Sequence, residues 1–171
     1  MVMVIMARSS AERIEEILEE ESSLTSKPDG VREVPDGSVD FENVSFSYVN
    51  DPNNTSLNHI DLHIRSGETV GILGGTGASK TTLVQLIPRL YDVTVGTVKV
   101  GGIDVREYDL EVLRNEVAMV LQKNTLFSGT IKENLRWGNE HASDEEIERV
   151  CRLAQADPFI QEMPDKYDTY I

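Results

Sequence analysis

A glycine-rich stretch at residues 74–82, GGTGASKTT, holds the residues in this sequence that are best suited to chemistry. Such a loop turns several backbone N–H groups inward around a concave site, and a helix that follows adds its dipole. The site suits a chain of phosphates: Lys80 can reach β- and γ-phosphate oxygens, and the Thr81 hydroxyl can ligate Mg²⁺. We predict that the phosphate-contacting residues are Gly75, Thr76, Gly77, Ala78, Ser79, Lys80, Thr81 and Thr82.

The loop departs at one position from the usual pattern G-x-x-x-x-G-K-[ST]. Ser79 stands where the last glycine is expected. If that position needs a left-handed backbone, serine costs about 1–2 kcal/mol, whereas otherwise the change is mild. Taken alone, the stretch could also be an ordinary glycine-rich turn before a helix.

Two apolar runs are expected to position this chemistry. Residues 69–73 (TVGIL) are typical of a central strand buried on both faces, and residues 80–91 have helical spacing, so the loop has a strand before it and a helix after it. Residues 117–121 (VAMVL) predict a second buried strand. Gln122 follows at its carboxyl end, where α/β sheets place ligands.

The remaining pattern predicts an α/β fold with a β-rich lobe beside a parallel sheet. Alternating apolar residues at 39–48 and 60–64 predict half-buried strands, and a further strand is expected at 97–100. Leu110 and Leu113 predict a short helix. Two more helices are expected at 130–135 and 143–154, the second with Ser143 as its N-cap.

Composition narrows the function classes. The formal net charge of -14 argues against a nucleic-acid partner, because binding a phosphate backbone needs clustered Lys and Arg. Cys151 is the only cysteine, which excludes an internal disulfide, and we expect it to be a small buried residue. The three histidines show no metal-ligand spacing.

The N-terminal part is predicted to be one helix over residues 1–22, with an apolar stripe made by Ala7, Ala11, Ile14 and Leu18. Breakers such as Pro28 mark a linker after it. No segment reaches the roughly 20 apolar residues that span a bilayer. The apolar residues 1–7 are either the last part of a membrane helix or a short exposed segment.

From Val39 onward the chain resembles the ATPase domain of ABC transporters of the exporter type. VDFENVSFSY ends in Tyr48, at the place of that family's adenine-stacking aromatic residue, and residues 96–122 resemble the stretch that ends at the Q-loop glutamine, here Gln122. LFSGTIKENLRWG, residues 126–138, is characteristic of exporters. The segment ARSSAERIEEILEEE is similar to the end of the last membrane helix in such exporters, which favours the first interpretation of residues 1–7.

The resemblance implies an ABC-type P-loop NTPase core with an antiparallel β-subdomain, incomplete at the C-terminus, and it implies ATP and Mg²⁺ as cofactors. Tyr48 would stack on the base, worth roughly 1–3 kcal/mol. Thr81 and Gln122 would hold the metal, and Gln122 would be the catalytic contact to the attacking water. We favour local packing over a partner contact for Trp137.

Partners and domain limits also follow from the resemblance. They are a second ABC nucleotide-binding domain, in a homo- or heterodimer, and the exporter's transmembrane domain, at the cytoplasmic face of the plasma membrane. Residues 1–22 would then be the end of the last transmembrane helix, 23–37 a linker, and 38–171 the N-terminal part of the nucleotide-binding domain.

The family's LSGGQ-type signature, its metal-binding aspartate with the adjacent catalytic glutamate, and its switch histidine do not occur in this sequence. We therefore expect this chain to bind nucleotide without turnover. The alternative is a truncated or degenerate subunit with a regulatory or assembly role. An unrelated phosphate-loop enzyme, such as a small kinase, is disfavoured by residues 126–138.

Overall fold

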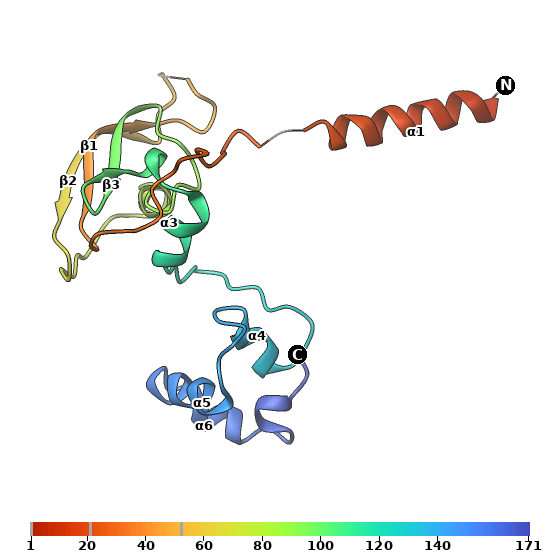
Figure 1. The fold of residues 1–171 in the computed structure, drawn as a ribbon, viewed down its shortest axis with the longest axis vertical. Helices are drawn as coiled ribbons and strands as arrows, with labels where there is room; N and C mark the ends of the chain where they lie inside the picture. Colours follow the sequence, from red (N-terminus) through yellow and green to blue (C-terminus); the bar gives the residue numbers. More distant parts are fainter. Residues whose placement is uncertain (1, 21, 52) are drawn as a thin grey trace. The chain divides into compact units, whose positions relative to one another are not determined.

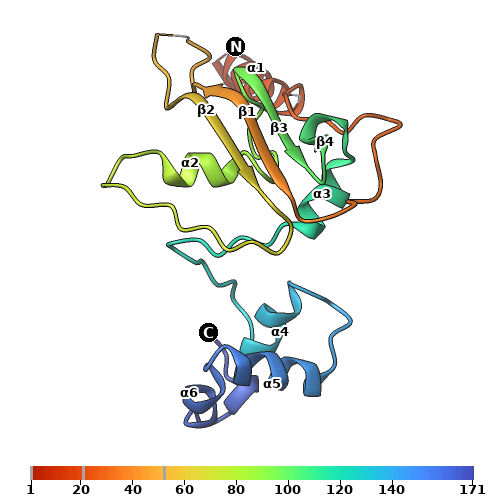
Figure 2. The ribbon, with the colours of Figure 1, turned by 90° about the vertical axis from the view of Figure 1, so that its left-hand side faces the viewer.

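The computed structural model describes residues 2–20, 22–51 and 53–171; in the N-terminal helix it describes the side chains of residue 8 and of residues 11–18. The chain forms two compact units, Met1–Ala118 and Met119–Ile171, and each is described by itself. The first unit is built on a β-sheet and the second is helical (Figures 1 and 2).

The sheet of the first unit has four strands in the order β2-β1-β3-β4. β1 (Val39–Phe46) lies in the middle and pairs antiparallel with β2 (Leu57–Ile64) on one side and β3 (Val95–Val100) on the other. The short β4 (Ile103–Asp104) pairs antiparallel with β3. These strands confirm the predicted half-buried segments, and their apolar residues supply one buried face, although register shifts around Val44 interrupt the alternation in β1.

Helices cover that apolar face (Figure 1). They are α2 (Lys80–Gln85) and α3 (Leu110–Glu116), the latter preceded by a 3-10 turn, η1 (Val105–Glu107). The buried core combines side chains from the strands with Leu86, Tyr108 and Leu113. The helix predicted over 80–91 is shorter than expected, because Pro88 has no N–H and disfavours helical backbone in the residue before it.

The two predicted buried strands are not strands in the structure. Residues 69–73 and 117–121 have no regular secondary structure and are unpaired, and Leu73 and Val120 are 97% and 94% exposed. A strand exists only when a neighbouring strand takes its hydrogen bonds, and within the described ranges no segment pairs with either run. The expected parallel sheet is therefore not formed by these residues.

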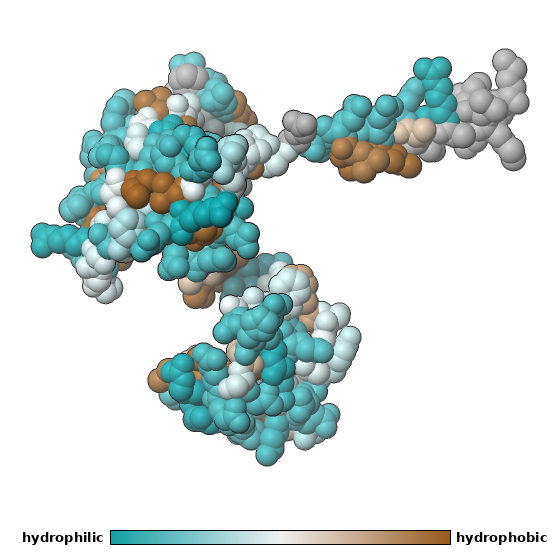
Figure 3. Space-filling view, in the orientation of Figure 1, coloured by the Kyte–Doolittle hydropathy of each residue, from teal (hydrophilic) through white to brown (hydrophobic). Residues whose placement is uncertain are grey.

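The N-terminal helix α1 (Val2–Leu18) ends four residues before the predicted boundary at residue 22. Of the predicted stripe, the Ala7 side chain lies outside the described residues, whereas Ala11, Ile14 and Leu18 are exposed. Figure 3 shows this apolar band on one side of the helix. In the part of the chain that the structure describes, no helix is both long and apolar enough to cross a membrane.

Residues 23–34, here called the strap, lie within the predicted linker 23–37 and are bound to the first unit. Val31 exchanges backbone hydrogen bonds with Glu107 (2.9 Å) and Asp109 (3.0 Å). Lys27 Nζ lies 2.5 Å from a carboxylate oxygen of Glu107. The buried Arg89 donates to the carbonyl of Thr25, at 3.4 Å. The strap is therefore part of the packed unit.

The second unit contains α4 (Ile131–Arg136), α5 (Asp144–Leu153), α6 (Asp157–Gln161) and the 3-10 turn η2 (Lys166–Asp168). Helices α4 and α5 confirm the sequence prediction within one residue, with Thr130 and Ser143 as side-chain N-caps. The short α6 was not predicted. The core of the unit is small and contains Cys151, which is buried as expected, with Ile147, Ile160 and Tyr167.

Candidate functional site

The glycine-rich loop lies between the unpaired residues 69–73 and the start of α2. Two of its residues have left-handed backbone: Gly77 has φ 81° and Ser79 has φ 54°. The position of Ser79 therefore needs the conformation that glycine adopts freely. The strain of a serine in this conformation is about 1–2 kcal/mol. Ser79 is also the N-cap residue of α2, and its side chain makes no capping hydrogen bond.

Lys80 folds back over the loop. Its Nζ donates to the carbonyl oxygens of Gly74 and Gly75, both at 2.8 Å. The loop residues 71–78 are exposed, as is Thr81. Within the described residues, the backbone N–H groups of Lys80, Thr81 and Thr82 bond no protein acceptor, as expected of a first helical turn. An ammonium group and several free N–H donors are thus gathered at one exposed place, which suits an anion.

Tyr48 joins this place from the end of β1. Its hydroxyl oxygen lies 2.9 Å from Oγ1 of Thr82, which is buried. Tyr48 as a whole is 53% exposed, and its side chain stands beside the first turn of α2. The structure brings Tyr48 together with the first turn of α2 across 34 residues of sequence.

A second tyrosine that the sequence analysis missed lies against Tyr48. The ring of Tyr91 is 5.2 Å from that of Tyr48, at an interplanar angle of 88°. Both rings line a cavity of about 430 Å³, whose other walls include Ser23 and Leu24 of the strap. The sequence analysis included Tyr91 in the helix predicted over residues 80–91, whereas in the structure α2 ends at Gln85 and Tyr91 follows it in an irregular turn.

Gln122, the predicted catalytic and metal-binding residue, lies in the second unit and is exposed. The buried strand that was to hold its amide is absent, because residues 117–121 are unpaired. Trp137, also in the second unit, stacks on Phe127 with ring centroids 4.5 Å apart. Trp137 is 72% exposed, so this packing is a surface pair rather than part of a core.

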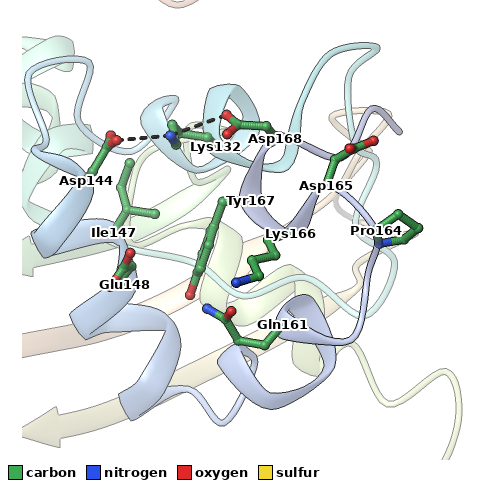
Figure 4. Close-up of a pocket in the computed structure, with 10 residues that line it drawn as sticks. All are labelled: Lys132, Asp144, Ile147, Glu148, Gln161, Pro164, Asp165, Lys166, Tyr167 and Asp168. Atoms are coloured by element: carbon green, nitrogen blue, oxygen red, sulfur yellow. Dashed lines mark hydrogen bonds and ion pairs between the residues drawn. The ribbon is translucent and has the colours of Figure 1, made fainter.

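The second unit has a polar cavity of about 310 Å³, shown in Figure 4. At its rim Lys132 bridges Asp144 (3.0 Å) and Asp168 (3.3 Å), so this charge joins α4, α5 and η2. Tyr167 is buried beside the cavity and donates to Oδ1 of Asp157, at 2.7 Å. Burial, and then this hydrogen bond, raise the pKa of Tyr167. These contacts hold the helices together and gather no reactive group.

A glycine-rich loop with Lys80 and Thr81 at the start of a helix, packed on a sheet, defines a protein of the phosphate-loop class. A comparison with known protein families shows which family within this class the chain belongs to. Residues 57–170 match the model of the ABC transporter family, so the chain belongs to that family.

Similar proteins agree with this membership. The chain is 43% identical over 164 residues to a putative multidrug export ATP-binding/permease protein, YgaD, of Bacillus subtilis (95% of this chain, 28% of the relative). It is 38% identical over 162 residues to an ATP-dependent lipid A-core flippase of Desulfotalea psychrophila (94% and 28%). Among solved structures, a bacterial Atm1-family ABC exporter with ATP bound matches with a TM-score of 0.85 and 30% identity.

That structural match covers 95% of this chain and 28% of the exporter. The chain therefore spans little more than a quarter of the length of the relatives it matches. The match confirms the expected ABC-type fold class, including the antiparallel β-subdomain, for the part of the family fold that this sequence covers.

Proposed function

We propose that this chain is the part of an ABC exporter that binds Mg-ATP, and that the parent protein couples ATP binding and hydrolysis to transport of a substrate across a membrane. The observation that carries the proposal is the grouping of Lys80, free helical N–H groups and the exposed ring of Tyr48 around one loop. Names of relatives such as the export ATP-binding/permease protein and the lipid A-core flippase support the transport role.

Each residue has a task in this proposal. The loop N–H groups and the ammonium of Lys80 bind phosphate oxygens, and the ring of Tyr48 receives the base. Gly75 and Gly77 fit a tight approach, because a Cβ there would project into the open space above the loop. The Thr81 hydroxyl would hold Mg²⁺, which supplies neutralisation of phosphate charge, and the metal contact of Gln122 stays a prediction.

Hydrolysis needs a residue that orients and activates the attacking water, and the family's motif with the catalytic glutamate does not occur in this sequence. We therefore propose that the chain by itself binds nucleotide without turning it over. In the parent, the transmembrane domain and a second nucleotide-binding domain are the proposed partners, and the cytoplasmic face of the membrane is the proposed location.

The test is calorimetric binding of Mg-ATP to the chain and to Lys80→Ala. We expect at least tenfold weaker binding in the variant, since charge-assisted hydrogen bonds to phosphate are lost. Arg65→Ala is the matched control, because it removes one positive charge from an exposed residue of the same unit and should not change the affinity. If both variants lost the same affinity for Mg-ATP, the loss would be due to net charge alone and would contradict a binding site at Lys80.

Turnover is measured on the same proteins. We expect no phosphate release above background. Steady-state hydrolysis that Lys80→Ala abolishes would overturn the proposal that the chain lacks turnover.

The strained serine favours one second candidate, a degenerate site that keeps nucleotide contacts for regulation or assembly. Ser79 occupies a left-handed position that suits glycine. If Ser79→Gly tightens Mg-ATP binding markedly, the natural loop is weakened at this position, which favours the degenerate site.

A further inference from the structure

Three aromatic rings form a cluster beside the proposed base site, and each of them contacts the other two. Tyr48 lies 4.8 Å from Phe46 and 5.2 Å from Tyr91 by ring centroids, with interplanar angles of 80° and 88°. Phe46 and Tyr91 are 5.6 Å apart. The two contacts of Tyr48 are edge-to-face, an arrangement that aromatic pairs prefer, so Phe46 and Tyr91 restrain the plane of the Tyr48 ring.

The hydrogen bond of Tyr48 does not by itself fix the plane of the ring. The phenolic oxygen lies on the axis about which the ring rotates, so the contact to Thr82 Oγ1 locates the tip of the side chain and leaves rotation about that axis free. The plane of the Tyr48 ring must therefore be set by its aromatic neighbours, and stacking on a base depends on that plane.

The two neighbours are held differently. Phe46 is 3% exposed and belongs to the core of the first unit. Tyr91 is 40% exposed and lines the cavity of about 430 Å³ that it shares with Tyr48 and with Leu24 of the strap. Without the ring of Tyr91 this cavity would grow, and the ring of Tyr48 would have room to turn into it.

The turn that carries Tyr91 is held by several hydrogen bonds. Arg89, which precedes Tyr91 in this turn, is 7% exposed and has a left-handed backbone with φ 51°. Its guanidinium makes two bonds to the carboxylate of Asp92, on the other side, at 2.7 and 3.1 Å. Arg114 of α3 donates to the Arg89 carbonyl at 2.9 Å. Tyr91 is thus bracketed by a two-point ion pair and tied to a core helix.

We propose that Tyr91 is a positioning residue for nucleotide binding: by holding the plane of the Tyr48 ring, it prepares the surface on which the base stacks. The inference rests on the proposed function, because it assigns a role toward the same nucleotide. Tyr91 acts through Tyr48, so it contributes to recognition of the base and leaves binding of the phosphates unchanged.

The experiment compares Mg-ATP with Mg-bound inorganic triphosphate, a probe that has phosphates and no base. Tyr91→Leu removes the ring, and Tyr91→Phe keeps it. We expect Tyr91→Leu to weaken Mg-ATP binding about tenfold, within the range that base stacking is worth, and to leave triphosphate binding within about twofold of the original. Tyr91→Phe should bind both ligands as the unaltered chain does.

Each other outcome overturns a defined part of the argument. If the unaltered chain binds neither ligand, the proposed function fails and takes this inference with it. If the chain binds Mg-ATP and Tyr91→Leu binds it equally well, only the role of Tyr91 fails. An equal loss of ATP and triphosphate binding in Tyr91→Leu, or a loss in Tyr91→Phe as large as in Tyr91→Leu, would mean that Tyr91 supports the fold and does not orient the base surface.

Discussion

The hydroxyl oxygens of Tyr48 and Thr82 lie 2.9 Å apart, which joins the end of a β-strand to the first turn of the helix that follows the phosphate-binding loop. Thr82 is buried and Tyr48 is half exposed, so the contact connects the core to the surface of the proposed site. It fixes where the aromatic ring stands relative to Lys80 and Thr81, two and one residues before Thr82.

This contact predicts coupling between the two side chains. Tyr48→Phe and Thr82→Val each remove it, and the free energies of unfolding should show a coupling of about 0.5–1.5 kcal/mol in a double-mutant cycle. Urea unfolding followed by circular dichroism measures this value. Tyr170→Phe is the control, because Tyr170 is 72% exposed and in the other unit. Strict additivity of the two changes would contradict the coupling.

Ser79→Gly should stabilise the first unit. The substitution releases about 1–2 kcal/mol of backbone strain, of which the greater freedom of glycine in the unfolded chain takes back roughly half, leaving a gain of about 1 kcal/mol or less. The midpoint of urea unfolding reports it. Ser79→Ala keeps the strained φ of 54° and should bring no gain. A gain in Ser79→Ala equal to that in Ser79→Gly would show that strain is not the cause.

Gly30→Ala should release the strap. A Cβ at Gly30 would lie 2.6 Å from the backbone nitrogen of Asp109, a distance that no packed structure accommodates without movement. We expect trypsin to cleave after Arg32 faster in this variant than in the unaltered chain. Mass spectrometry measures the rate of this cleavage. Gly37→Ala is the matched control, because its Cβ would meet only the Ser66 Oγ at an ordinary 3.5 Å. Equal cleavage rates in the two variants would contradict the close packing of the strap.

The second unit should lose stability in acid through Asp144. Lys132, and after it Arg136, hold the pKa of Asp144 below its usual range. Because the folded pKa is lower than the unfolded value of about 4, the ionised carboxylate stabilises the fold above that value. The contribution is lost as the pH falls through the folded pKa.

Asp144→Asn should therefore lower the unfolding midpoint at pH 7 and have little effect at pH 2. The fluorescence of Trp137, the only tryptophan, reports on this unit. Asp165→Asn is the control, since within the described part of the chain Asp165 makes no ion pair. An effect of Asp144→Asn that is equally large at both pH values would exclude the ionic contribution.

The sequence by itself determined the elements that depend on neighbours along the chain. Strand β1, the N-cap at Ser143 and the place of the loop before a helix were all predicted, because pleat, cap and turn are set by residues a few positions apart. The departure at Ser79 was also visible in the sequence. The predicted role of Gln122 remains a prediction.

Only the tertiary structure decided what depends on residues far apart in the chain. Residues 69–73 and 117–121 have the composition of strands, but a strand needs the hydrogen bonds of a partner, which composition does not supply. The left-handed backbone of Ser79 follows from how the loop joins α2. Tyr91 meets Tyr48 across 43 residues because β1 and the turn after α2 pack on one another, and such packing leaves no mark in a local pattern.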